Sequence, residues 1–115
     1  MSSEKSWQLR VGHILEAIGK IQRYTDGLTN DTFAADEKTV DAVVRNFQVL
    51  GEAARQVPPE IQSKYPEIPW AIMQGMRHIL VHDYFKVKVD IVWRTVQTDL
   101  PTLIAPLQQV LHENP

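Results

Sequence analysis

Residues 40–57, VDAVVRNFQVLGEAARQV, carry the pattern that decides the fold. Apolar residues recur along this stretch at intervals of three and four, at Val40, Val43, Val44, Phe47, Leu50, Ala54 and Val57. This spacing places them on one face of an α-helix and predicts an amphipathic helix of about 20 residues. Pro58 and Pro59 should end the helix, because neither proline can donate a helical N–H.

Three further segments have the same periodicity. Before residues 40–57, we expect a helix that Ser6 caps, that Asp26-Gly27 ends and that buries Trp7, Val11, Ile14, Leu15, Ile18 and Ile21. Between these two helices, the polar stretch TNDTFAADEK predicts a connection. A short helical turn is expected over PEIQSKY, residues 59–65, before Pro66.

Pro69 suits the first position of a third main helix, where its missing N–H is not needed. That helix should run from Trp70 to about His82 and bury Ile72, Met73, Met76, Ile79 and Leu80. A fourth should open near Asp90, bend at Pro101 and again at Pro106, and bury Ile91, Val92, Val96, Leu100, Leu103, Leu107 and Leu111. Trp70 and Trp93 are expected to anchor the core. The prediction is an all-α, antiparallel four-helix bundle with a short extra helix.

Composition limits the possible functions. The 115 residues predict one domain, 1–115, and the absence of Cys excludes disulfide scaffolds, thiol nucleophiles and iron–sulfur sites. No apolar run approaches the length of a membrane span, and the N-terminus lacks a signal-peptide core, so we expect a cytoplasmic protein with no membrane partner. The net charge of −2 disfavours general coating of nucleic acids, and DNA is not an expected partner.

The polar cluster RHILVHDYF, residues 77–85, holds the strongest candidate chemistry. On a helix, Arg77 and Tyr84 would point within about 20° of each other, whereas His82 would point about 140° from Arg77. Arg77 and His82 converge only if the helix ends near His82 or if a second copy of the chain supplies the other half. The structural alternative is a helix C-terminus with a dipole-compatible histidine and an interfacial tyrosine.

Two other sets of residues have structural or weak metal-binding interpretations. His78 and His82 are four residues apart on one helix face, but they lack a third ligand and an HExxH pattern. Arg45 and Glu52 lie seven residues apart on one stripe and predict a partly buried ion pair. Gly51 between them predicts close helix packing, because a helical glycine costs about 1 kcal/mol relative to alanine.

Three segments in order resemble the HepT-like branch of the HEPN superfamily, the toxin half of HepT–MntA-type toxin–antitoxin pairs. RNFQVLGEAAR resembles the family's second-helix signature, YPEIPWAIMQGMRHILVHDYF its central motif and VDIVWRTVQTDLPTL its last helix. The diagnostic Arg-x4-His-x-Tyr motif is met by Arg77, His82 and Tyr84. His78 departs from the pattern, because many relatives have Asn or another small polar residue beside the arginine.

The resemblance implies a homodimer whose two motifs face each other across a cleft, and RNA cleavage that needs no metal or other cofactor. The RNA 2′-OH would attack the adjacent phosphorus. His82 would move the proton and Arg77 would hold the charge of the phosphorane, which makes both catalytic. His78 and Tyr84 would contact the substrate.

The resemblance also implies a type VII-like toxin–antitoxin pair. Its MntA-type nucleotidyltransferase antitoxin would transfer AMP to Tyr84, placing an anionic nucleotide beside Arg77. Two alternatives stay open on the sequence. One is a non-catalytic HEPN scaffold module that binds a nucleotide or a protein, and the other is a metal protein using His78 and His82.

Overall fold

The computed structural model describes residues 3–82 and 89–115, apart from the side chains of residues 3–6 and 78–82. Every regular element in these ranges is a helix, which confirms the predicted all-α class. The elements are α1 (Ser3–Thr25), α2 (Asn30–Ala34), α3 (Glu37–Arg55), α4 (Pro59–Lys64), α5 (Trp70–His82), α6 (Val89–Arg94), the π-helical turn η2 (Thr95–Asp99) and α7 (Leu100–Glu113). None of the described helices has the length and apolarity needed to cross a membrane.

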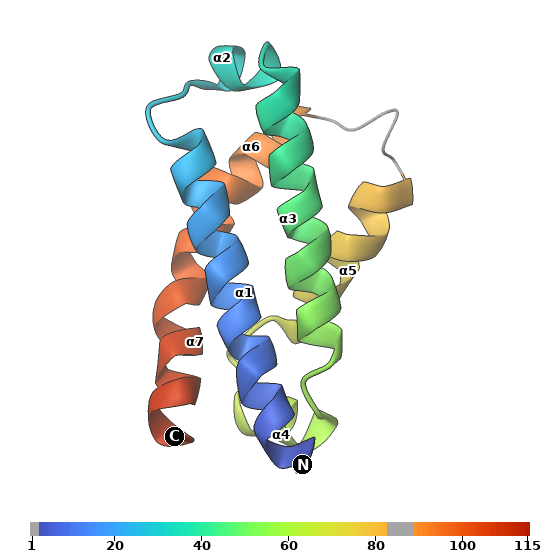
Figure 1. Ribbon diagram of the computed structural model, residues 1–115, viewed down its shortest axis with the longest axis vertical. Helices are drawn as coiled ribbons and strands as arrows, with labels where there is room; N and C mark the ends of the chain where they lie inside the picture. Colours follow the sequence, from blue (N-terminus) through green and yellow to red (C-terminus); the bar gives the residue numbers. More distant parts are fainter. Residues whose placement is uncertain (1–2, 83–88) are drawn as a thin grey trace.

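The long helices form an antiparallel bundle (Figure 1). Helix α3 packs between α1 and α5, and α7 packs along α1. The described chain measures 44 × 27 × 26 Å along its principal axes. Both chain ends lie at the α4 end of the bundle, and α2 lies at the other end. The predicted four-helix arrangement is therefore confirmed, with α6, η2 and α7 together forming the fourth helix.

The apolar stripes of α1 and α3 form the centre of the core. Their buried members are Trp7, Val11, Ile14, Ile18, Ile21, Val43, Val44, Phe47, Leu50 and Ala54. Burial of each large aliphatic or aromatic side chain contributes about 1.5–3 kcal/mol relative to exposure, so these two faces determine how α1 and α3 align. Leu15 and Val40 are only half-buried at the edge of this core.

Helix α3 begins after the N-cap residue Asp36 and ends just before a pair of prolines. Asp36 accepts hydrogen bonds from Thr39, at 3.1 Å from the backbone N–H and at 2.7 Å from the hydroxyl. These hydrogen bonds hold the pKa of the Asp36 carboxyl below its ordinary value. The helix ends at Arg55, shortly before Pro58 and Pro59, as predicted.

The polar connection before α3 contains a helix that the prediction missed. Thr29 and Thr32 form a reciprocal capping box, in which each hydroxyl accepts a hydrogen bond from the other residue's backbone N–H. The single turn of α2 then buries Phe33 completely. The Phe33 ring lies 5.2 Å from the ring of half-buried Trp93, which fixes α2 against α6.

The fourth helix departs from α-helical geometry just before Pro101. Over η2 the turn widens, and the Leu100 N–H bonds to the Thr95 carbonyl, five residues earlier. A wider turn accommodates the proline ring, which would otherwise press on the carbonyl of Gln97. The irregularity predicted at Pro101 therefore takes the form of a π-helical turn, and Pro106 lies inside the continuous α7.

Two residues expected in the core are exposed. The exposed fractions are 66% for Ile72 and 44% for Ile91. The core prediction for both was wrong. Helix α5 lies at the side of the bundle, where α3 covers only its inner face, so Ile72 stays exposed, and on α6 the neighbouring Val92 is buried in place of Ile91. Ile72 and Ile91 instead border a surface hollow of about 180 Å³ that Met76 and Val92 also line.

Candidate functional site

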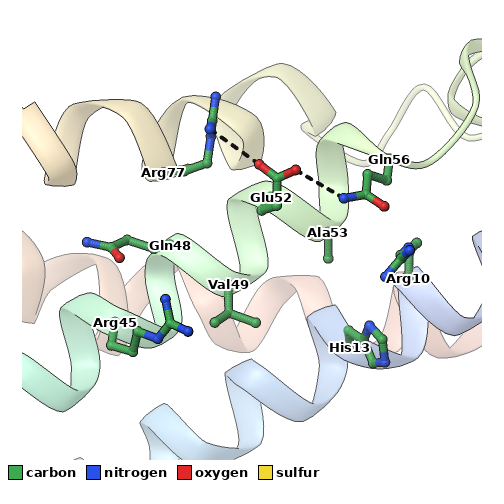
Figure 2. A pocket seen from close by; sticks show the side chains of 9 residues that line it. All are labelled: Arg10, His13, Arg45, Gln48, Val49, Glu52, Ala53, Gln56 and Arg77. Atoms are coloured by element: carbon green, nitrogen blue, oxygen red, sulfur yellow. Dashed lines mark hydrogen bonds and ion pairs between the residues drawn. The ribbon is translucent and has the colours of Figure 1, made fainter.

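A polar cleft runs over α3, between α1 on one side and α5 on the other (Figure 2). Its volume is about 430 Å³. Each of the three helices contributes charged side chains to its walls. The lining residues are Arg10, His13, Arg45, Gln48, Val49, Glu52, Ala53, Gln56 and Arg77.

Arg77 reaches this cleft because α5 packs closely on α3 at Gly51. A Cβ built on Gly51 would lie 2.6 Å from the Arg77 Cβ and 2.7 Å from the Arg77 backbone nitrogen. Real Cβ atoms do not approach so closely, so the position requires glycine. The sequence prediction of close packing at Gly51 is confirmed, and its effect is to bring the Arg77 backbone against α3.

The Arg77 guanidinium forms an ion pair with Glu52, and part of the side chain stays exposed to solvent. Its Nη1 lies 3.3 Å from Glu52 Oε1, and the side chain is 42% exposed. Its Nε is buried and has no hydrogen-bond partner in the described part of the chain. The buried Nε is closed to solvent, so an anion that enters the cleft would contact the exposed part of the guanidinium.

Glu52 is the acceptor around which the site is organised. Its carboxylate accepts hydrogen bonds from Arg55 Nη2 at 2.7 Å and from Gln56 Nε2 at 3.0 Å. These bonds, with the charges of Arg55 and Arg77, lower the pKa of Glu52 to about 2. Glu52 is therefore ionised at neutral pH and keeps an acceptor beside Arg77 (Figure 2).

The predicted ion pair between Arg45 and Glu52 is not formed. Seven residues along α3 separate the two backbones by roughly 10 Å, and Glu52 points instead toward Arg55 and Arg77. Arg45 lines the cleft and makes no ion pair with any other described residue.

Arg10 and His13, on α1, form the far wall of the cleft and were missed by the sequence analysis. They are three residues apart and so share one face of α1. Figure 2 shows both on the opposite side of α3 from Arg77. Their spacing was a usable signal, but nothing in the sequence indicates that this face of α1 lies beside α3.

The other predicted motif residues lie outside what the structure describes. Helix α5 is described as far as His82 and includes His78, but the described side chains do not include theirs. Tyr84 lies outside the described residues. The metal hypothesis for His78 and His82 therefore stays untested. Elsewhere in the described part, no three His, Cys, Asp or Glu side chains are grouped to hold a metal.

The chain matches one known protein family over most of its length. The family model described as "Ribonuclease HepT-like" matches residues 14–110, which include α3, α5 and Arg77. No solved structure gives a significant match.

Curated relatives have names of the same kind. A Thermococcus cleftensis protein named "Probable ribonuclease HepT" is 41% identical over 90 residues, covering 78% of this chain and 82% of the relative. A Caldanaerobacter subterraneus protein named "Putative RNase TTE0752" is 31% identical over 101 residues, covering 88% and 90%.

One relative is much longer than this chain. A Methanocaldococcus jannaschii protein named "Gamma-glutamylcyclotransferase and putative RNase MJ0434" is 36% identical over 109 residues. The match covers 95% of this chain and 49% of the relative, so the chain spans about half of that protein's length.

Proposed function

Because the chain belongs to the HepT-like ribonuclease family, we propose that it is an endoribonuclease that cuts RNA without a metal ion or other cofactor. The observation that carries this proposal is the arrangement of Arg77. Its guanidinium is oriented by Glu52 at 3.3 Å, and the side chain is 42% exposed in a cleft that has room for a phosphodiester.

The proposed reaction uses the RNA's own 2′-OH as the nucleophile. Attack on the adjacent phosphorus forms a pentacoordinate phosphorane and then expels the 5′-oxygen, leaving a cyclic phosphate. Arg77 stabilises the added negative charge, and His82 transfers the proton. His78 and Tyr84 contact the substrate in this proposal.

We propose that the active form is a homodimer. On one helix Arg77 and His82 point about 140° apart, so a symmetry-related chain is a simple way to bring one of each to the same phosphate. The exposed Ile72 and Ile91 support this, because a second copy would remove them from water.

The test is RNA cleavage by the purified protein in excess EDTA. The wild type should leave cyclic phosphate ends. Arg77→Ala and His82→Ala should lose cleavage with unchanged helicity. Arg55→Ala, which removes the other arginine at Glu52, and His112→Ala, an exposed histidine on α7, should retain it. A wild type that leaves RNA intact but binds nucleotides would favour the scaffold module instead.

We further propose that this protein is the toxin of a type VII-like pair, neutralised when an MntA-type nucleotidyltransferase transfers AMP to Tyr84. Co-expression with such an enzyme should increase the intact mass by one AMP residue and abolish RNA cleavage. Tyr84→Phe should prevent the addition, whereas Tyr24→Phe, at an exposed tyrosine on α1, should not. Modification of the Tyr84→Phe variant would place the acceptor elsewhere.

A further inference from the structure

We infer that Arg10 and Arg45 form a track for the RNA backbone, which carries the strand away from Arg77 across α3. The inference rests on the proposed ribonuclease function and assigns a substrate-binding role to residues outside the Arg-x4-His-x-Tyr motif. Both arginines line the same cleft as Arg77. They come from α1 and α3, so the track is built by the packing of two helices that are distant in sequence from α5.

The first support is the charge of the cleft. Its lining includes three arginines and one carboxylate, Glu52, whereas the whole chain has a net charge of −2. Glu52 is already engaged by Arg55 and Arg77. Arg10 and Arg45 make no ion pair within the described residues, so their charges are available to an anion.

The second support is the length of the cleft. Along α3 and its C-cap the lining extends from Arg45 to Gln56, eleven residue steps and therefore roughly 16 Å. A single phosphate group bound at Arg77 would leave most of this length empty. A strand of several nucleotides would place successive phosphates along it, which is how cationic grooves bind single strands.

The third support is the type of side chain that lines the cleft walls. None of the nine lining residues is Phe, Tyr or Trp, and His13 is the one described lining residue whose ring could stack on a base. Its apolar members, Val49 and Ala53, are too few to form the apolar centre typical of a protein interface. Guanidinium groups with the amides of Gln48 and Gln56 suit phosphate and sugar oxygens, so binding here should be insensitive to base sequence.

The experiment measures binding of a short fluorescent RNA that is 2′-O-methylated throughout, so that the protein cannot cut it. The Kd is determined over a series of salt concentrations for the wild type and for Arg10→Ala/Arg45→Ala. Each lost phosphate contact should reduce the slope of log affinity against log salt by about 0.7, so the double variant should lose about 1.4. Two RNAs of different sequence should show the same loss.

The control is Arg23→Ala, which removes one positive charge from an exposed position on α1 outside the cleft. It should leave the slope unchanged, and circular dichroism should show that all variants are folded. If the wild type cuts and binds RNA but the double variant keeps the wild-type slope, the proposed RNA-binding track is wrong. The proposed ribonuclease function is then unaffected. If the wild type binds RNA through both arginines but cleaves no RNA, the result supports the proposed track and contradicts the proposed ribonuclease function. Unchanged RNA binding with weakened capture of a co-expressed acidic protein would make the cleft a protein interface and overturn the track.

Discussion

Gly51 and Arg77 lie closer together than any residue with a side chain would allow at position 51. A Cβ at Gly51 would meet the Arg77 Cβ at 2.6 Å and the Met73 carbonyl at 3.0 Å. The glycine thus sets the separation of α3 and α5, and this separation places the Arg77 guanidinium within 3.3 Å of Glu52. Helix packing and the proposed chemistry depend on the same contact.

Gly51→Ala should destabilise the protein, because the new methyl group meets the backbone of α5 and cannot be relieved by rotating a side chain. Overpacking of this kind costs about 1–3 kcal/mol, more than the gain of about 1 kcal/mol from alanine's helix propensity. Urea denaturation should show a lower midpoint, and RNA cleavage should fall as Arg77 shifts away from Glu52.

The matched control is Gly12→Ala on α1, where a Cβ would have no atom within 4 Å. There only the propensity gain applies, so the midpoint should rise. Equal effects of the two substitutions would contradict the close contact between α3 and α5.

Arg77→Lys should abolish most cleavage while preserving the positive charge. A lysine ammonium group cannot keep the ion pair with Glu52 and at the same time form two parallel N–H hydrogen bonds to a phosphate. We therefore expect at least a hundredfold loss in kcat. Because the Arg77–Glu52 pair is partly exposed, the melting temperature should change little. Arg55→Lys tests the same change at the other arginine of Glu52, outside the cleft lining, and should remain active. Full activity of Arg77→Lys would show that only charge is needed.

Glu52→Gln should alter the dependence of stability on pH. The folded pKa of Glu52, about 2, lies below the ordinary value of 4.5, so its carboxylate stabilises the fold above pH 4.5. This contribution is lost as the pH falls from 4.5 toward about 2. The side chain is 35% exposed, so the contribution should stay below about 1 kcal/mol.

The measurement is the difference in unfolding free energy between the wild type and Glu52→Gln at several pH values. Asp36 and Glu113 also have lowered pKa values, and because both proteins retain them, the difference isolates Glu52. A difference that grows on acidification would have the wrong sign for a lowered pKa.

Helix positions were predictable from the sequence because each long helix has an apolar stripe and a proline or polar residue at its ends. The stripes of α1 and α3 are buried as expected. The short α2 was missed because its signal is local, a capping box between Thr29 and Thr32 around one buried ring, Phe33. A five-residue helix has too few turns to show periodicity.

The site was only partly predictable, because helical spacing orders residues along one helix and does not relate different helices. Gly51 indicated close packing, but its partner, Arg77, was visible only after folding. The same limitation led to the incorrect pairing of Glu52 with Arg45. Arg10 and His13 lie far from the motif in sequence and reach the cleft only because α1 packs on α3.

Ile72→Asp should weaken the proposed homodimer. Ile72 is 66% exposed in the single chain, so the charge should cost little in folding but should disfavour burial against a second copy. Light scattering after size-exclusion chromatography should show a lower mass at the same concentration. Leu9→Asp is the control, since Leu9 is 64% exposed on α1 and far from the hollow beside α5. A monomeric wild type would contradict the dimer directly.

Tyr65→Phe should loosen the end of the bundle where the chain termini lie. The Tyr65 hydroxyl donates to Glu113 at 2.7 Å and accepts from Asn114 Nδ2 at 2.9 Å, and the Asn114 carbonyl accepts from Gln8 on α1 at 2.6 Å. Loss of the hydroxyl should reduce the free energy of unfolding by about 1 kcal/mol.

The pH dependence identifies the hydrogen bond as the cause of that loss. Glu113 accepts a hydrogen bond from the phenol O–H and so raises the pKa of Tyr65 above its ordinary value of 10.0. The stabilisation is therefore complete below pH 10 and is lost as the pH rises through the folded pKa. The stability difference between the wild type and Tyr65→Phe should shrink in strong alkali, whereas Tyr24→Phe, at an exposed tyrosine, should show little difference at any pH. If the stability difference between the wild type and Tyr65→Phe stays constant above pH 10, the hydroxyl acts by packing alone.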